Sequence, residues 1–232
     1  MPKEKPEQLS FDNMLEDTGT DASSLAIPDA DDSVAPITIY SSEAKFNPED
    51  ITPPVLKLMQ GLSPEVQDGS ARPGQWSLSG YEPKEALTIV PLSYAKRREY
   101  RDPDTNVITC TSYGGEFGQG TPGGTCADCP MNKWTGEGKN RRGPQCVFMY
   151  SYMVYIAEYD TGAILNFKRT GLAVGRSLNS AVNRLGFGHV VVKISGKIQT
   201  GGKGTYYIPQ LVPIRGEAGD EFLQKAVAYF GE

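Results

Sequence analysis

The sequence has a single histidine among its 232 residues, and it has no cysteine outside the stretch from 110 to 146. One histidine cannot serve a two-metal nuclease, which would instead need clustered carboxylates. The chain also lacks a P-loop, a nucleophile elbow and a motif with paired catalytic carboxylates. These absences argue against an enzyme, and we expect a binding protein.

Long apolar runs are missing as well. No stretch of about 18 apolar residues occurs, so no segment is expected to span a membrane. The N-terminus is acidic and has no apolar signal stretch. We therefore expect a cytoplasmic protein, which means the host cytoplasm if the protein is viral.

Acidic residues are scarce in the body of the chain and concentrated at its N-terminus. The formal net charge of −5 by itself argues against a nucleic-acid binder, but residues 1–36 alone carry nine Asp/Glu against two Lys. Residues 96–207 carry 15 Lys/Arg against eight Asp/Glu, a surplus of +7. An acidic segment attached to a basic body is therefore the pattern that a function must explain.

The acidic segment is expected to be disordered over residues 1–46, because it is rich in Ser, Asp and Pro and has only isolated apolar residues. Residues 9–15 are an exception, since their four apolar side chains are spaced to form one face of a short helix. This stretch is either a docking segment for a replication or transcription protein, or part of a leader that only keeps the chain soluble.

The four cysteines form the pattern Cys110-x15-Cys126-x2-Cys129-x16-Cys146, in a glycine-rich segment with few aliphatic residues. The central pair has the spacing at which one tight turn presents two thiolates to a tetrahedral ion, and the outer cysteines would complete the set. Loops of this composition cannot bury a core of their own, so one structural Zn2+ would supply their folding energy. Four thiolates leave no open coordination position, which indicates a structural rather than a catalytic ion.

Two other uses of these cysteines stay open. Two disulfides would require an oxidising compartment, which the missing signal stretch does not favour. A redox pair at Cys126 and Cys129 would normally open a helix after a strand, whereas here the pair lies between glycine-rich loops and is followed by Pro130.

Hydrophobic periodicity predicts a mainly β chain with two helices. The helical stripe is clearest at Leu172, Leu178, Val182 and Leu185, and Gly186 supplies a stop. We expect a short apolar element at 54–60, strands at 86–94, 107–112, 146–158, 164–169, 190–198 and 205–214, and helices at 171–185 and 217–230.

Without the cysteine segment, the order is strand, long strand, strand, helix, strand, strand, which is the order of the five-stranded oligonucleotide-binding (OB) barrel. We therefore expect residues 47–232 to form a mainly β OB-fold domain with the helix between strands 3 and 4. A zinc ribbon would be inserted at about 107–147, between strands 1 and 2, and a C-terminal helix would follow the barrel.

On this order and on Cys110, Cys126, Cys129 and Cys146, the chain resembles the zinc-containing single-stranded-DNA-binding proteins of bacteriophages. It is also similar to the zinc-ribbon barrel of the large subunit of replication protein A, where the insertion falls in the same loop. The resemblance covers residues 86–214 and implies that a single strand binds on the strand 2–3 face, between the 1–2 and 4–5 loops. The all-cysteine set and the N-terminal position of the acidic segment depart from the phage pattern.

Binding single strands without sequence preference needs cations for the phosphates and flat rings for the bases. The expected DNA contacts are Lys96, Arg97, Arg98, Tyr100, Arg101, Lys133, Trp134, Arg141, Arg142, Tyr150, Tyr152, Lys168, Arg169, Lys203 and Tyr206. Further candidate rings are Tyr94, Tyr113, Phe117 and Tyr207.

Three of these expectations have an alternative. The cluster Lys96–Arg101 would otherwise be a solvated edge that blocks unwanted strand pairing. Trp134 would otherwise pack over the zinc ribbon. We expect Phe148, Tyr150 and Tyr152 to point outward from one face of their strand, and they would be lost as contacts if that face is the core.

The sequence thus predicts a single-stranded-DNA-binding protein that acts in DNA replication or recombination of a bacteriophage. The alternative keeps the fold but makes the protein a single-stranded-DNA-binding transcription factor. Residues 9–15 or the ribbon would then recruit or activate an RNA polymerase.

Overall fold

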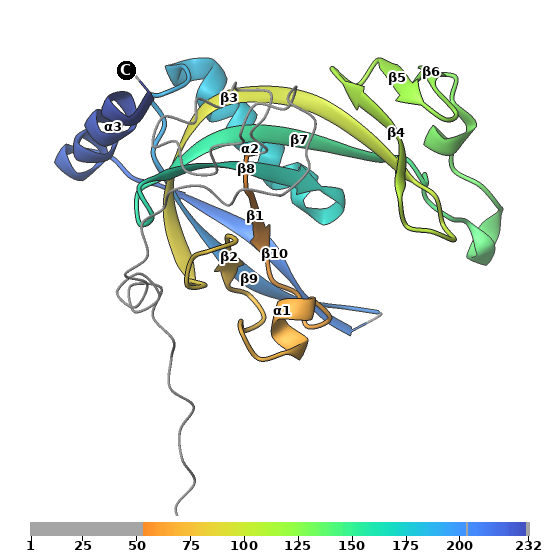
Figure 1. Ribbon diagram of the computed structural model, residues 1–232, viewed down its shortest axis with the longest axis horizontal. Coiled ribbons are helices and arrows are strands. Elements are labelled where there is room, and N and C mark those ends of the chain that lie inside the picture. Colours follow the sequence, from red (N-terminus) through yellow and green to blue (C-terminus); the bar gives the residue numbers. More distant parts are fainter. Residues whose placement is uncertain (1–52, 203, 231–232) are drawn as a thin grey trace, which may run out of the picture. The chain divides into compact units, whose positions relative to one another are not determined.

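The computed structural model describes residues 53–202 and 204–230, all within one compact unit that extends from Pro48 to Glu232. These residues are mainly β, in one ten-stranded sheet, and a helix follows the last strand as the sequence predicts (Figure 1). The expected order of strands and helices is confirmed in this part of the chain.

Three long strands form the centre of the sheet. β3 (Ala86–Arg101), β7 (Val147–Ile156) and β8 (Thr161–Lys168) pair antiparallel in the order β3-β7-β8. Their buried parts are rich in β-branched and aromatic residues, which pack well on a pleated surface. The register places Tyr94 beside Tyr152, so side chains distant in sequence share one face of the sheet.

A second pair of strands continues the sheet on the other side of β3. β9 (Val192–Gly201) pairs with the first residues of β3 and with β10 (Gly204–Pro213). Helix α2 (Leu172–Leu185) connects β8 to β9, where the sequence changes to a helical period.

The expected closed five-stranded barrel does not form, and the sheet is open. Closure would require β10 to pair with β8, and the described strands contain no such pair. β1 (Val55–Leu58), the short apolar element expected at 54–60, instead pairs in parallel with β8. Pro209 and Pro213 lie on β10 and lack the amide hydrogen that regular pairing needs. The prediction of closure was therefore wrong, because the free edge of β8 is taken and β10 is a poor partner.

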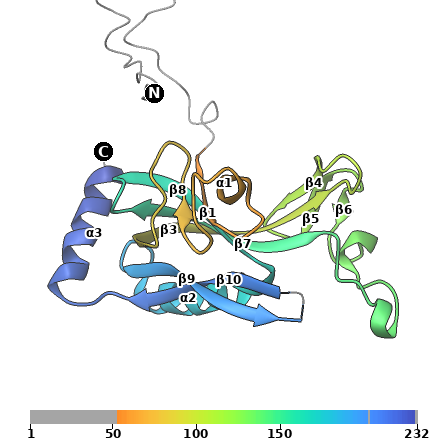
Figure 2. The ribbon, with the colours of Figure 1, turned by 90° about the horizontal axis from the view of Figure 1, so that it is seen from below.

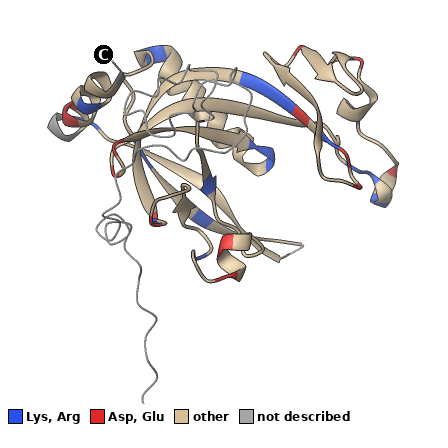
Figure 3. Cartoon of the chain, in the orientation of Figure 1, with Lys and Arg blue, Asp and Glu red and all other residues tan. Residues whose placement is uncertain are grey.

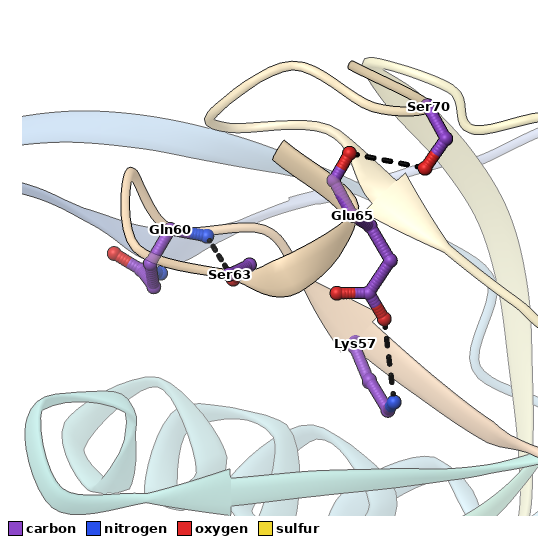
Figure 4. A network of polar contacts seen from close by, with 5 residues as sticks. All are labelled: Lys57, Gln60, Ser63, Glu65 and Ser70. Atoms are coloured by element: carbon purple, nitrogen blue, oxygen red, sulfur yellow. Dashed lines mark hydrogen bonds and ion pairs between the residues drawn. The ribbon is translucent and has the colours of Figure 1, made fainter. Parts of the chain in front are cut away.

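One side chain bridges the gap between β1 and β10. Gln60 donates a hydrogen bond to the carbonyl of Tyr207 at 3.0 Å and accepts one from the amide of Tyr207 at 2.9 Å. The backbone amide of Gln60 in turn donates to Ser63 Oγ at 2.9 Å, in the turn before the short helix α1 (Pro64–Gln67) (Figure 4). This turn fixes the position from which Gln60 reaches β10.

Further polar contacts hold α1 beside β1. Ser70 Oγ donates to the carbonyl of Glu65 at 3.0 Å, and the Glu65 carboxylate lies 3.5 Å from Lys57 Nζ (Figure 4). β2 (Trp76–Ser77) pairs antiparallel with β1 and brings the ring of Trp76 into the core. The segment that contains β1, α1 and β2 is thereby attached both to β8, through β1, and to β10, through Gln60.

The main core lies between the sheet and α2. Leu178 and Val182 of α2 pack against the buried side chains of β3, β7, β8 and β9. Burying one large apolar side chain contributes about 1.5–3 kcal/mol, so this layer dominates the stability of the fold. Its most deeply buried members include Trp76, Leu78, Leu87, Ile89, Tyr152, Ile156, Leu165, Phe167, Leu178 and Ile194.

Helix α3 (Glu217–Phe230) covers a smaller second core, made with Val90, Tyr155 and Val191. Figure 2 shows α3 at one end of the sheet and the cysteine-bearing strands at the other. The Tyr155 hydroxyl donates to the Asp160 carboxylate at 2.6 Å. No helix within the residues that the structure describes is long and apolar enough to cross a membrane.

Candidate functional site

Residues 107–147 form an extension carried by the far halves of β3 and β7, which we call the cysteine extension. β4 (Ile108–Tyr113) pairs with β3, and β5 (Phe117–Gly120) pairs with both β4 and β6 (Gly124–Thr125). The extension lies at the end of β3 away from α3 (Figures 1 and 2). The extension is therefore connected to the rest of the domain through the continuous strands β3 and β7.

All four cysteines line one cavity of about 10 Å³ inside the cysteine extension. Cys110 lies on β4, Cys126 follows β6, Cys129 precedes the 3-10 turn Pro130–Asn132, and Cys146 precedes β7. All four are free thiols, so no disulfide joins them. A volume of this size accommodates about one water molecule or ion.

A glycine keeps this cavity open. A Cβ atom at Gly118 would lie 2.9 Å from Cys110 Sγ, closer than real Cβ contacts come. Gly118 and Tyr100, one of the predicted DNA contacts, both line the cavity. Tyr100 is therefore part of the wall of the cysteine cavity.

The four thiols are close enough to affect one another. Burial raises the pKa of the Cys146 thiol, the Arg98 guanidinium acts in the opposite direction, and Cys126, Cys129 and Cys110 raise it further. Thiols in this position would repel each other as thiolates unless a cation lay among them.

The donor set and the cavity suit a tetrahedral ion, but the side chains do not complete a site as they stand. No group of three or more His, Cys, Asp or Glu side chains within 53–202 and 204–230 is arranged to hold a metal. The residue types, their burial and their convergence on one small cavity fit Zn2+.

Arg98 ties the cysteine extension to β3. Its Nε donates to the carbonyl of Gly115 at 3.0 Å and its Nη1 donates to Asn132 Oδ1 at 2.6 Å, while the guanidinium lies 5.0 Å from the ring centroid of Phe148. Asn132 donates in turn to the carbonyl of Cys126 at 2.9 Å. These bonds occupy a guanidinium that the sequence predicted to contact DNA. Asn132 was not predicted, because no spacing or periodicity marks it.

Strand alternation divides the basic stretch of β3 between two faces. Lys96 and Arg98 lie on the inner face, which further along the strand meets the core and α2. Arg97 and Arg101 lie on the outer face, where the Glu99 carboxylate approaches them at 3.5 and 3.9 Å. Figure 3 shows this basic stretch on β3 with an acidic position beside it. The sequence predicted one basic cluster over Lys96–Arg101, and the structure divides it into two cations on the inner face and two on the outer face.

Four strands present one cross-strand row on the outer face. The register places Tyr113 beside Arg97, Arg97 beside Met149, and Met149 beside Lys168. The Arg97 guanidinium lies 4.9 Å from the ring centroid of Tyr113, and Tyr113 is 66% exposed, whereas Met149 is buried. We call these four residues the cationic row. Because neighbouring strands are about 4.8 Å apart, it extends about 14 Å across the sheet.

The cationic row ends beside a groove between β8 and β10. The groove has a volume of about 530 Å³, and its lining includes Lys168, Arg169, Tyr206 and Tyr207. Neither Lys168 nor Arg169 forms an ion pair with any other residue that the structure describes. Arg169 has a φ angle of 50°, which is uncommon for a residue with a side chain. Three predicted contacts therefore meet at this groove, in the gap that the open sheet leaves.

A third group of predicted contacts lies at the far end of the cysteine extension. Trp134 is 60% exposed, and the Arg141 guanidinium lies 4.7 Å from its ring centroid. Lys133 and Arg142 are exposed beside them, and Phe117 is an exposed ring on β5. Trp134 therefore stacks with an arginine at the surface and also lies over Gly143 of the extension, where a Cβ atom would be 3.6 Å from its ring.

The inner face of β7 is closed at Tyr152. Tyr152 is 1% exposed and donates a hydrogen bond to Asn179 of α2, and a Cβ at Gly175 of the same helix would lie 2.8 Å from the Tyr150 ring. The prediction that Phe148, Tyr150 and Tyr152 point outward is therefore wrong: all three lie on the inner face, where Tyr152 is buried in the core and Tyr150 packs against it. The reason is that α2 covers this part of the sheet, which strand periodicity alone does not reveal.

Three predictions lie outside the described residues. They are the DNA contact at Lys203 and, for the N-terminal segment, disorder over 1–46 and the docking segment at 9–15.

No protein-family model matches the chain, and neither a curated protein nor a solved structure does. The chemistry of these surfaces is therefore the basis on which a function is inferred.

Proposed function

We propose that the protein binds single-stranded DNA without sequence preference. The observation that carries the proposal is the cationic row, in which Arg97 stacks on the exposed ring of Tyr113 and Lys168 lies two strands further across the sheet. Single-strand binding requires cations that follow the phosphates and rings on which bases stack. The row ends at the groove with Arg169 and Tyr206, so a strand crossing the sheet would meet a cation and a ring at each end of its path, with the buried Met149 between them.

The order of the elements supports the same function. We assign the sheet to an open variant of the OB fold, in which β3, β7, β8, β9 and β10 correspond to strands 1 to 5. OB folds bind oligonucleotides on the strand 2–3 face and the adjoining 1–2 and 4–5 loops. In this assignment the cationic row crosses strands 2 and 3, the cysteine extension is the 1–2 loop, and the turn after β9 is the 4–5 loop.

We further propose that Cys110, Cys126, Cys129 and Cys146 hold one structural Zn2+. When bound, the ion would supply folding energy to an extension that has no core. Four thiolates and one Zn2+ leave two negative charges, and the Arg98 guanidinium is positioned to offset part of them. The exposed rings of the extension would then have fixed positions beside the sheet. Such a protein would act where DNA is transiently unpaired, in replication or recombination, and would not cleave it.

Fluorescence anisotropy of labelled oligo-dT, measured over a range of salt concentrations, tests the proposal. We expect single strands to bind more tightly than duplex, with log K falling by about 0.7 per tenfold rise in salt for each phosphate contacted. Replacing Arg97 and Lys168 together with alanine should make this slope less steep by about 1.4. A flat salt dependence, or equal binding of duplex, would overturn the proposal.

Lys225→Ala is the matched control. Lys225 lies on α3, at the opposite end of the sheet, where it pairs with Glu221 at 2.8 Å. Its removal changes the net charge by the same amount as removal of Lys168, and should leave the salt slope unchanged. A slope that becomes less steep by about 0.7 in Lys225→Ala, half of the change expected in the double variant, would mean that binding follows overall charge and not the cationic row.

A further inference from the structure

Helix α2 carries a polar stripe that the core does not use. Arg176, Asn179, Ser180 and Asn183 recur at three- and four-residue spacing, which places them along one side of the helix. This stripe lies beside the apolar residues that face the sheet, and the row of contacts proposed for DNA does not include it.

The stripe forms one wall of an open cavity of about 600 Å³, lined by Asn179, Ser180 and Asn183. Tyr94 of β3 and Tyr152 of β7 also line it. Small-molecule sites have volumes of about 300–1,000 Å³, so the cavity is large enough for a ligand the size of a nucleotide.

Two aromatic rings border this cavity. Tyr94 is half-buried in its wall, whereas Phe187 is 42% exposed at its edge. Phe187 stands between Gly186 and Gly188, whose φ angles are 90° and 72°, and the amide of Gly188 donates to the carbonyl of Pro91 at 2.9 Å. The turn is therefore anchored to β3 and holds an exposed ring beside the cavity, in a position to stack on a planar ligand.

The polar groups of the cavity are side-chain amides. Asn179 is held in place because it accepts a hydrogen bond from the hydroxyl of Tyr152 and also interacts with the hydroxyl of Tyr94. The amide of Asn183 is exposed and has no hydrogen-bond partner among the residues that the structure describes. An amide offers a donor and an acceptor side by side, which is the pattern that pairs with the edge of a nucleobase.

Two cations lie toward one end of this cavity. Lys96 follows Tyr94 by two residues on the same face of β3, about 7 Å further along the strand. Lys96 is beside Tyr150, and Tyr150 contacts α2 at Gly175, next to Arg176. Both Lys96 and Arg176 are exposed, and neither forms an ion pair within the described part of the chain.

We propose that the cavity between α2 and β3 binds one nucleotide. The base would lie between Phe187 and Tyr94 with its edge on the amide of Asn183, and the phosphate would face Lys96 and Arg176. The site lies on the face of β3 opposite the cationic row, so it does not depend on the function proposed above. A free mononucleotide and a nucleotide within a DNA strand offer this site the same base and phosphate.

Isothermal titration calorimetry with dAMP and dTMP tests the site, using the full chain and the variants Phe187→Ala and Asn183→Ala. We expect both mononucleotides to bind to the wild type, and the loss of one stacking ring to weaken binding by about tenfold. Asn183→Ala should weaken binding in the same direction. Both side chains are exposed, so thermal unfolding of the variants should match that of the wild type. Lys168→Ala, on the opposite face, is the matched control and should bind mononucleotides as the wild type does.

Several results would overturn this site. The first is that the wild type binds no mononucleotide. The second is that Phe187→Ala and Asn183→Ala both bind mononucleotides as tightly as the wild type does. The third is that Lys168→Ala is the variant that loses binding while the other two keep it. The last result would instead locate the nucleotide on the cationic row. Oligo-dT anisotropy with Phe187→Ala then identifies the source of the ligand. Weaker binding means that a nucleotide of the strand enters the cavity, and unchanged binding means that the cavity takes a free nucleotide.

Discussion

The side-chain amide of Gln60 makes both backbone hydrogen bonds of Tyr207, donating to its carbonyl at 3.0 Å and accepting from its amide at 2.9 Å. The Gln60 side chain thus makes the two backbone hydrogen bonds that a neighbouring strand would make, at the edge of β10 that does not pair with β8. The groove that contains Lys168 and Arg169 borders this contact, and Gln60 is part of its lining. The open sheet and the proposed DNA groove therefore have the same structural origin.

Replacing Gln60 with leucine should lower the free energy of unfolding by about 1–3 kcal/mol, because the amide and the carbonyl of Tyr207 both lose their partner. Urea denaturation measures this change. Gln210→Leu is the matched control on the same strand, because Gln210 is exposed and makes no side-chain hydrogen bond within the described residues, and it should stay within about 0.5 kcal/mol of the wild type. Equal losses in the two variants would show that the Gln60 contact does not hold β10.

Substituting Cys126 and Cys129 with serine should release about one zinc ion per chain and make the cysteine extension sensitive to proteases. Elemental analysis and limited proteolysis follow the two effects. Treating the wild type with a chelator should reproduce both, whereas a reducing agent should have no effect because the thiols are free. Unchanged metal content in the double variant would refute the zinc site.

Arg98→Met should loosen the cysteine extension, because the carbonyl of Gly115 and the side chain of Asn132 both lose a charged donor. A hydrogen bond to a charged group contributes about 1.5–3 kcal/mol, so amide exchange should become faster over 107–147. Arg101→Met, on the outer face of the same strand, is the matched control. Its guanidinium is half-exposed, with only a weak ion pair and one longer hydrogen bond, so exchange should stay as in the wild type. Equal acceleration in the two variants would contradict a positioning role for Arg98.

Stability should depend on pH through Tyr155. Burial, and then the hydrogen bond to Asp160, raise the pKa of Tyr155 to about 12, against about 10 in an unfolded chain. Between these values the unfolded chain releases the proton and the folded chain keeps it. The contribution of Tyr155 is therefore fully present below pH 10 and is lost as the pH rises from about 10 to 12.

Urea denaturation of Tyr155→Phe on both sides of pH 10 measures this contribution. The variant should lose less stability than the wild type as the pH rises through this range. Tyr206→Phe removes a hydroxyl bonded to Gln199 at the surface, and should keep the wild-type dependence. The assignment fails if Tyr155→Phe and the wild type lose stability in parallel.

Periodicity predicted the elements well because it is a local property. The helix expected at 171–185 is α2 (Leu172–Leu185), and the helix expected at 217–230 is α3 (Glu217–Phe230). Apolar spacing of 3.6 or 2 residues reflects which face of an element is buried, and it does not depend on the identity of the neighbour. The same property explains the error at Tyr152, since alternation separates two faces of a strand without saying which one a helix covers.

The sequence predicted that the four cysteines would meet, and they line one cavity. The prediction rested on their spacing and on the glycine-rich loops between them, which have too few apolar side chains to form a core of their own. Only the folded chain decided which charges act together. Arg97 and Lys168 share a row because of the register of β3, β7 and β8, and Lys96 and Arg98 lie on the other face, which the packing of α2 makes the inner one. Register and helix packing depend on contacts between residues far apart in the chain, and those contacts have no local signal.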